Sequence, residues 1–124
     1  MELDLQGRKV LITGGSKGIG LACAHSFARE GASVIVAARD EQRLADVRAK
    51  LADTEGKQVT IFAGDLGQAD GRERLFATHP DIDILVNNAG AIPAGDLFDI
   101  DLERWIAAWQ LKVFGYVHLT RLYL

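Results

Sequence analysis

Four short runs of apolar and β-branched residues recur along the chain, separated by longer stretches in which apolar positions follow helical spacing. The runs cover residues 9–13, 33–38, 59–63 and 82–87, and most of them show little alternation between apolar and polar positions. Strands of this kind are typical of a parallel sheet whose two faces are both covered. We therefore predict four strands that are buried in a parallel sheet.

The stretches between these runs predict helices. Apolar residues at helical spacing favour helices over about 18–30, 41–52 and 69–77, with Gly31 as the stop signal of the first. A fourth helix is predicted to begin near Asp101, a candidate N-cap residue, and to run through the last apolar segment. The resulting β-α-β-α-β-α-β-α order predicts an α/β fold with a doubly wound parallel sheet, in one domain over residues 1–124.

The composition narrows the classes of function. The 124 residues carry a formal net charge of −3, and the 14 basic residues are scattered along the chain. This distribution argues against a nucleic-acid-binding protein and against attachment to an anionic membrane. The sequence shows neither a signal-peptide pattern nor a membrane-spanning apolar run, which favours a cytoplasmic location.

The single cysteine and the three histidines do not follow a metal or disulfide pattern. Cys23 lies among apolar residues of the first predicted helix and is expected to be a small buried hydrophobic residue. His25, His79 and His118 have no acid or cysteine at metal-ligand spacing, so we predict structural roles for them and no metal site.

The most informative motif is the glycine turn between the first strand and the first helix. It reads Gly14-x-x-x-Gly18-x-Gly20. Glycines let the backbone approach a phosphate closely, and a helix N-terminus offers that phosphate free N–H groups and the positive end of a dipole. Leu21 and Ala22 stand where a P-loop needs lysine and a hydroxyl residue, which disfavours a kinase or ATPase. Taken alone, the motif could also be a turn that only packs a strand against a helix.

A second motif follows the fourth strand. It reads Asn87-Asn88-Ala89-Gly90, at the sheet edge where open α/β folds bind their ligands. Together with Thr13-Gly14-x-x-x-Gly18-Ile19-Gly20 it resembles the short-chain dehydrogenase/reductase family, and Gly64-Asp65-Leu66 and Trp105 stand in the family's order. The resemblance covers the whole chain. It implies a Rossmann-like sheet, truncated here after the fourth strand and the following helix, and an NAD(P)-dependent oxidoreductase that acts on an alcohol or a ketone.

The resemblance also assigns residues to the cofactor. It implies that the pyrophosphate and the adjoining ribose are held by Gly14, Ser16, Lys17, Gly18, Ile19 and Gly20. Asp65 and Leu66 are implied to border the adenine, although Asp65 alone also suits a turn-forming aspartate. The wall beside the ribose is implied to consist of Asn88, Ala89 and Gly90, with Asn87 tying neighbouring strands together.

The choice of cofactor depends on the end of the second strand. NAD sites usually place an acid there, which binds the ribose 2′-hydroxyl, but the corresponding position in this chain is Ala38. Arg39 follows it and Lys17 lies in the glycine turn, and two cations near the 2′ position favour the additional phosphate of NADP. We therefore predict NADP as the preferred cofactor and NAD as the alternative. Asp40 is assigned to the start of the second helix, where an acid suits the helix N-terminus. The alternative for Arg39 is a solvated residue at the same helix start.

The sequence departs from the family pattern in its length. Members of the family are substantially longer, and their catalytic serine and Tyr-x-x-x-Lys pair lie beyond the region matched here. Neither Tyr116 nor Tyr123 forms that pair, so both are predicted to be core or interface aromatics. Two functions stay open: an oxidoreductase of small molecules whose cofactor-binding half this is, or a truncated nucleotide-binding fragment without catalysis.

The last predicted helix carries two further expectations. It is apolar almost all the way round, and in the family it packs against a partner subunit, which implies a homo-oligomer formed through residues 101–124. With this helix uncovered and the 82–87 strand at a sheet edge, residues 1–124 alone are expected to be poorly soluble or molten.

Lys112 stands where the family has a catalytic asparagine, seven residues after Trp105. It is either a lysine that reaches solvent or a cation near the catalytic tyrosine of a complete enzyme.

Overall fold

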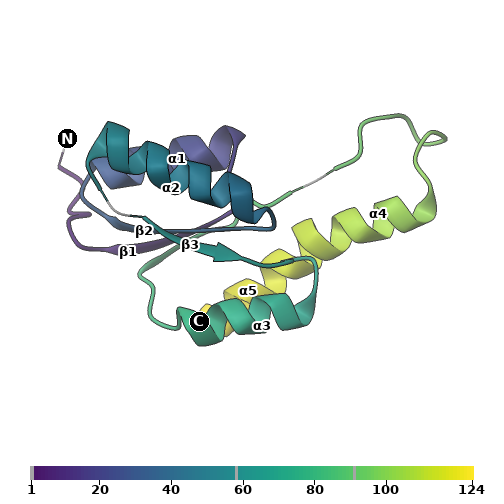
Figure 1. Ribbon diagram of the computed structural model, residues 1–124. Helices are drawn as coiled ribbons and strands as arrows, with labels where there is room; N and C mark the ends of the chain where they lie inside the picture. The colour runs from purple at the N-terminus through teal and green to yellow at the C-terminus, as the bar shows by residue number, and fades with distance from the viewer. Residues whose placement is uncertain (1, 58, 91) are drawn as a thin grey trace.

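The computed structural model describes residues 2–57, 59–90 and 92–124 and contains one four-stranded sheet. The strands are β1 (Lys9–Thr13), β2 (Ser33–Ala38), β3 (Thr60–Ala63) and β4 (Ile84–Val86). Their order is β3-β2-β1-β4, and every neighbouring pair is parallel (Figure 1). The predicted Rossmann-like α/β fold is therefore confirmed, with the third and fourth strands shorter than their apolar runs.

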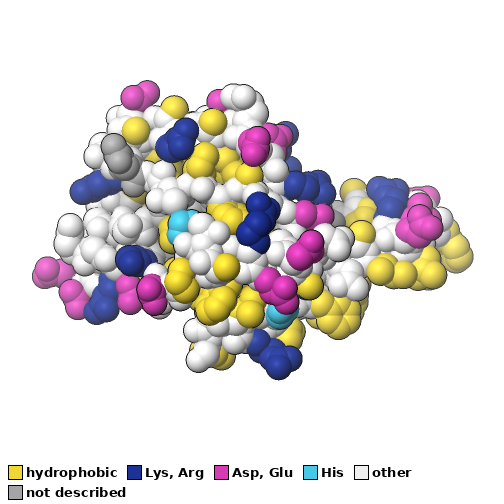
Figure 2. Space-filling view, turned by 60° about the horizontal axis from the view of Figure 1, so that its bottom comes forward, with side chains coloured by type: hydrophobic (Ala, Val, Ile, Leu, Met, Phe, Trp, Pro, Cys, Tyr) yellow, Lys and Arg dark blue, Asp and Glu magenta, His cyan; other side chains and the backbone are white. Residues whose placement is uncertain are grey.

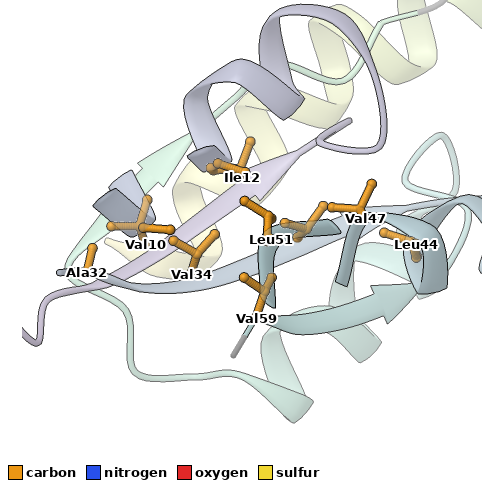
Figure 3. Packing of buried hydrophobic residues seen from close by; sticks show 11 residues of the cluster. Val10, Ile12, Ala32, Val34, Leu44, Val47, Leu51 and Val59 are labelled. Carbon is orange, nitrogen blue, oxygen red and sulfur yellow. The ribbon is translucent and has the colours of Figure 1, made fainter. Parts of the chain in front are cut away.

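Helices cover both faces of this sheet. Helices α1 (Gly18–Arg29) and α2 (Glu41–Glu55) lie on one face, and α3 (Ala69–Thr78) and α5 (Gly115–Tyr123) lie on the other (Figure 1). Alternate residues of each strand therefore enter different cores. Val10, Ile12 and Val34 pack against the α1–α2 side (Figure 3). Leu11 and Ile35 pack against the α3–α5 side. Burial on both faces explains why the strand sequences show so little polar alternation.

Helix α2 is longer than the apolar pattern predicts. Its last apolar core residue is fully buried Leu51, but the helix continues to Glu55 and ends at Gly56, whose φ is +62°. The extra turn is fixed to α1 through Glu55, which lies 3.0 Å from Arg29 Nη2 and 3.1 Å from His25 Nδ1. Hydrogen bonds from Arg29 and His25 hold the pKa of Glu55 below its usual range. Polar contacts thus extend the helix beyond its hydrophobic pattern.

The last predicted helix is helical without a break over 102–123, but it is not α-helical throughout. The segment consists of α4 (Leu102–Trp109), a π-helical turn η1 (Gln110–Phe114) and α5. Asp101 is the N-cap as predicted, because its side chain accepts a hydrogen bond from the Arg104 N–H at 2.9 Å. The wider turn adds one residue at the point where Gly115 packs closely against the Leu66 carbonyl. It therefore changes which residues face the sheet on either side of it.

Helix α4 extends away from the sheet (Figure 1), and its apolar side is uncovered. Leu102, Ile106 and Trp109 are 72%, 51% and 53% exposed, and Phe114 of η1 is 54% exposed. Figure 2 shows apolar side chains gathered along this protruding part of the molecule.

At the other end of the segment, Tyr123 is half-buried, packs edge-on against Phe76 and donates to the His79 carbonyl at 2.8 Å. Cys23 is half-buried and packs against the α1–α2 core.

Candidate functional site

The four parallel strands all end at the same edge of the sheet, so the loops that follow them converge there. They surround a cleft of about 560 Å³. It is lined by Gly14, Ser16, Lys17, Ala38, Arg39, Asp40, Arg43, Gly64, Asp65, Leu66, Ala89, Gly90 and Leu111. A second hollow of about 680 Å³ continues toward α4 and shares Arg39, Asp65 and Leu111 with the cleft. This is the edge at which open α/β sheets bind ligands.

The glycine turn is shaped by two different requirements. Gly14 has a φ of +68°, and a Cβ built on it would lie only 2.7 Å from the Ala89 Cα. Gly20 is similarly confined, since a Cβ there would overlap the Gly14 carbonyl oxygen. Gly18 has a φ of +57°, but nothing lies within 4 Å of its Cβ position. Gly14 and Gly20 thus allow close packing of the loops, whereas Gly18 leaves open space at the start of α1.

Helix α1 begins at this open space without a local counter-charge. Its N-cap residue Lys17 makes no side-chain capping bond, and its first turn contains no acid. The first N–H groups of such a helix need acceptors from outside the helix, and they form the positive end of its dipole. The geometry therefore suits an anion such as a phosphate group.

The Thr13 hydroxyl joins the glycine turn to the loop after β4, a role that sequence reasoning missed. Thr13 is 1% exposed, and its Oγ1 accepts hydrogen bonds from the Asn88 and Ala89 N–H groups at 3.0 and 3.1 Å. It also donates to the Val86 carbonyl at 3.4 Å. The Asn88 side chain donates to the Gly14 carbonyl at 3.2 Å, which completes the link. The available sequence signal was a hydroxyl residue at the end of a buried strand, directly before the glycines.

Three cations line the cleft beside the end of β2. Lys17 and Arg39 were expected there, and Arg43 joins them from the first turn of α2. The neighbouring acid, Asp40, serves as the N-cap of α2 and accepts from the Arg43 N–H at 3.1 Å. Its other oxygen lies 3.9 Å from Arg43 Nε. Asp40 therefore faces its own helix, as the sequence predicted, and Ala38 places no acid at the end of β2.

The loop after β3 forms the opposite wall. Asp65 accepts a hydrogen bond from the Gly67 N–H at 2.9 Å, so it forms a turn and also lines the cleft. Leu66 is 6% exposed and packs into the α3–α5 core. Leu111 of η1 completes this wall from the last helical segment and had not been identified from the sequence.

Asn87 does not have the contact that the sequence suggested. Its Nδ2 donates to Thr120 Oγ1 of α5 at 3.1 Å, so it links β4 to a helix instead of to a neighbouring strand. Its Oδ1 is buried without a partner among the described residues. Nearby, the Tyr116 hydroxyl donates to the Ala89 carbonyl at 2.8 Å, and burial raises the pKa of Tyr116. Tyr116 is thus a neutral donor that supports the loop, which agrees with a core aromatic.

The predicted site residues differ in their position relative to the cleft. The residues that line the cleft are Gly14, Ser16, Lys17, Arg39, Asp65, Leu66, Ala89 and Gly90. Gly20 and Asn88 hold the loops together behind it, and exposed Gly18 and Ile19 lie outside its lining. Lys112 is exposed on η1, with its Cδ 3.9 Å from the position of a Cβ on Gly90. Its aliphatic stem therefore lies beside the 87–90 loop.

No three His, Cys, Asp or Glu side chains among residues 2–57, 59–90 and 92–124 are grouped to hold a metal ion. None of the helices in those ranges is long and apolar enough to cross a membrane.

The sequence of the chain matches a known protein family. A model of the short chain dehydrogenase family matches residues 8–124. An uncharacterized oxidoreductase of Bacillus subtilis, YvaG, is 39% identical over 125 residues, which cover 100% of this chain and 47% of that protein.

Solved structures give the same relationship. L-sorbose reductase from Gluconobacter frateurii, complexed with NADPH and L-sorbose, superposes with a TM-score of 0.86 and 35% identity, over 98% of this chain and 48% of that one. A short-chain dehydrogenase from Sphingobium yanoikuyae in complex with NADPH gives a TM-score of 0.85 and 32% identity, over 94% and 47% of the two chains. The chain thus spans about half the length of the relatives it matches. By its sequence match and its fold, the chain belongs to the short-chain dehydrogenase/reductase family of oxidoreductases.

Proposed function

We propose that this chain is the dinucleotide-binding half of an oxidoreductase that uses NADP(H) and acts on an alcohol or a ketone. The observation that carries the proposal is the cleft itself, which is lined by the glycine turn and by three cations, one of them the N-cap residue of the uncapped helix α1. These features fit the pyrophosphate and the 2′-phosphate of NADP. When bound, the nicotinamide would supply or accept a hydride.

The proposed holding residues follow from their positions. The glycine turn and the first N–H groups of α1 hold the pyrophosphate, with Ser16 beside them. Asp65 and Leu66 border the adenine, and Ala89 and Gly90 border the ribose.

A guanidinium pairs two N–H groups with phosphate oxygens, so Arg39 is the main contact of the 2′-phosphate, assisted by Lys17 and Arg43. NAD is the alternative, but its 2′-hydroxyl would find no acid at Ala38. The two NADPH-bound relatives support NADP.

The reaction class is tested with the protein expressed from its complete coding sequence. NADPH oxidation is followed by absorbance in the presence of a panel of ketones, ketoses and aldehydes. Turnover with at least one carbonyl compound is the expected result. Tight NADPH binding without any turnover would instead favour the second possibility, a nucleotide-binding protein without catalysis. A cytoplasmic location also stays part of the proposal.

Arg39→Ala is expected to weaken NADPH binding by about tenfold, the loss typical of a hydrogen bond to a charged group. NADH affinity is expected to stay within about twofold of wild type, because NADH lacks the 2′-phosphate. Isothermal titration of both dinucleotides measures the two effects. Arg48→Ala, an exposed arginine of α2 that does not line the cleft, is the matched control. An equal loss for NADPH and NADH would refute the assignment of Arg39 to the 2′-phosphate.

We further propose that Lys112 places a cation near the substrate end of the cleft. Its stem lies beside the 87–90 loop, and its ammonium group is a donor without acceptor capacity. If this charge acts on a catalytic proton donor, Lys112→Ala should shift the pH–rate profile of the complete protein. A profile that coincides with that of the wild type would leave Lys112 as a lysine that simply reaches solvent.

The uncovered side of α4 and η1 is proposed to bind a second copy of the protein. Leu102, Ile106, Trp109 and Phe114 are all at least half-exposed. Ile106→Glu should shift the protein toward monomer in sedimentation equilibrium, since an exposed position tolerates the charge in the monomer but not in an apolar interface. Glu103→Gln on the same helix is the control. An unchanged molecular mass for Ile106→Glu would reject this surface as the interface.

A further inference from the structure

Arg72 of α3 is a charged residue inside the protein. Only 5% of it is exposed, and it lies between the loop after β3 and helix α5. Burial lowers the pKa of Arg72, whereas the nearby carboxylates of Asp65 and Glu73 favour its charged form. An apolar side chain would fill this space without the cost of removing a guanidinium group from water. The presence of arginine here therefore calls for an explanation from its contacts.

The guanidinium makes two short hydrogen bonds in different directions. Nη1 donates to the Leu66 carbonyl at 2.8 Å, and Nε donates to His118 Nδ1 at 2.8 Å. Because Nδ1 of His118 accepts, the imidazole is neutral and its proton lies on Nε2. Gly115 leaves the room for this arrangement, since its Cβ position is 3.3 Å from the Leu66 carbonyl and 3.6 Å from Arg72 Nη1.

Leu66, whose carbonyl Arg72 contacts, belongs to the wall of the cleft. The residues Asp65 and Leu66 line the cleft, while the Leu66 carbonyl contacts Arg72. The same loop is held by backbone bonds from Gln68 N–H to the Asp65 carbonyl and from Arg72 N–H to the Gln68 carbonyl, both 3.2 Å. Arg72 thus fixes the backbone of a wall that it does not itself line.

We propose that Arg72, held in orientation by His118, is a positioning residue that fixes the Leu66 carbonyl and thereby the wall that receives the adenosine half of the dinucleotide. This inference rests on the proposed function, which assigns the adenine to Asp65 and Leu66. It adds a chain of contacts from α5 through α3 to the cleft. His118 acts in it as a hydrogen-bond acceptor and not as a cation or a metal ligand.

The test compares binding of two probes to the complete protein: NADPH and adenosine 2′,5′-bisphosphate, which carries only the adenosine half. Arg72→Met and His118→Leu should each weaken both probes by about tenfold, because the first removes the donor and the second removes the acceptor that orients it. His118→Gln should stay within about twofold of wild type, since its side-chain oxygen can still accept from Arg72. Arg121→Met, an exposed arginine of α5, is the control. Urea unfolding midpoints check that each variant is folded.

The outcomes distinguish failure of the proposed function from failure of the inference about Arg72. Failure of the wild type to bind either probe overturns the proposed function and this inference with it. Normal binding by wild type, Arg72→Met and His118→Leu overturns only the inference. A loss seen for NADPH but not for the bisphosphate also overturns it, because the effect would then lie outside the adenosine wall. If Arg72→Met does not fold, the comparison of His118→Gln with His118→Leu tests the inference. Equal losses of affinity in these two variants would reject the role of His118 as the acceptor for Arg72.

Discussion

Replacement of Gly14 by alanine is expected to lower the free energy of unfolding by about 2–4 kcal/mol, the combined cost of left-handed backbone and overpacking. The backbone at Gly14 has a φ of +68°, which costs about 1–2 kcal/mol for an alanine. The new Cβ would lie 2.7 Å from the Ala89 Cα, so the two loops must separate. Because both loops line the cleft, NADPH affinity should fall with stability. Urea unfolding and isothermal titration measure the two effects.

Gly56→Ala is the matched control for this variant. Gly56 has a φ of +62°, but nothing lies within 4 Å of its Cβ position, and it ends α2 away from the residues that line the cleft. It should lose only the backbone contribution of about 1–2 kcal/mol and keep its affinity for NADPH. Equal destabilisation in the two variants would show that the contact between Gly14 and Ala89 is unimportant.

The second large effect is expected for Thr13→Val, which keeps the shape of the side chain and removes its hydroxyl. The Asn88 and Ala89 N–H groups then lose their acceptor next to a residue that is 1% exposed. Each buried unsatisfied donor costs about 1–3 kcal/mol, so the free energy of unfolding should fall by roughly 2–4 kcal/mol. The 87–90 loop should also loosen, which hydrogen exchange at those two amides would detect as faster exchange.

Thr13→Ser separates the hydroxyl from the methyl group. Serine retains the acceptor, so this variant should lose only about 1 kcal/mol for the buried methyl and keep slow exchange at Asn88 and Ala89. If Thr13→Val were as stable as Thr13→Ser, the hydroxyl would not be the link between the two loops.

The fold could be predicted from the sequence because its strands are buried on both faces. In β1 and β2, Val10 and Leu11, and Val34 and Ile35, enter opposite cores, so consecutive residues are all apolar. Such runs between amphipathic helices lead to a parallel sheet. The position of the cleft could also be predicted, because parallel strands end at the same edge of the sheet. The motifs in the loops that follow these strands therefore meet there.

The parts that could not be predicted depend on contacts between residues distant in the chain. The π-helical turn lies directly before Gly115, which approaches the Leu66 carbonyl 49 positions earlier, and the apolar pattern gives no local signal for it. Arg72 looks like an ordinary surface residue of a helix until His118 and Leu66 are brought beside it. Asn87 was assigned to a strand contact but donates to Thr120. Local periodicity carries no information about these side-chain pairs.

The limited solubility expected for residues 1–124 stays a prediction, with a physical basis in two features of the structure. The strand β4 lies at one edge of the described sheet, and the apolar side of α4 is uncovered. Both features expose groups that favour association with another chain or segment. A soluble monomer of these residues with a sharp cooperative melt would contradict this expectation.

The central claim is that the cleft at the carboxyl edge of the sheet binds NADP(H). Isothermal titration of the complete wild-type protein with NADPH and with NADH tests it most directly. The account predicts that NADPH binds at least about tenfold more tightly, because Lys17, Arg39 and Arg43 line the cleft while Asp40 caps its own helix. No binding of either dinucleotide, or tighter binding of NADH than of NADPH, would contradict it.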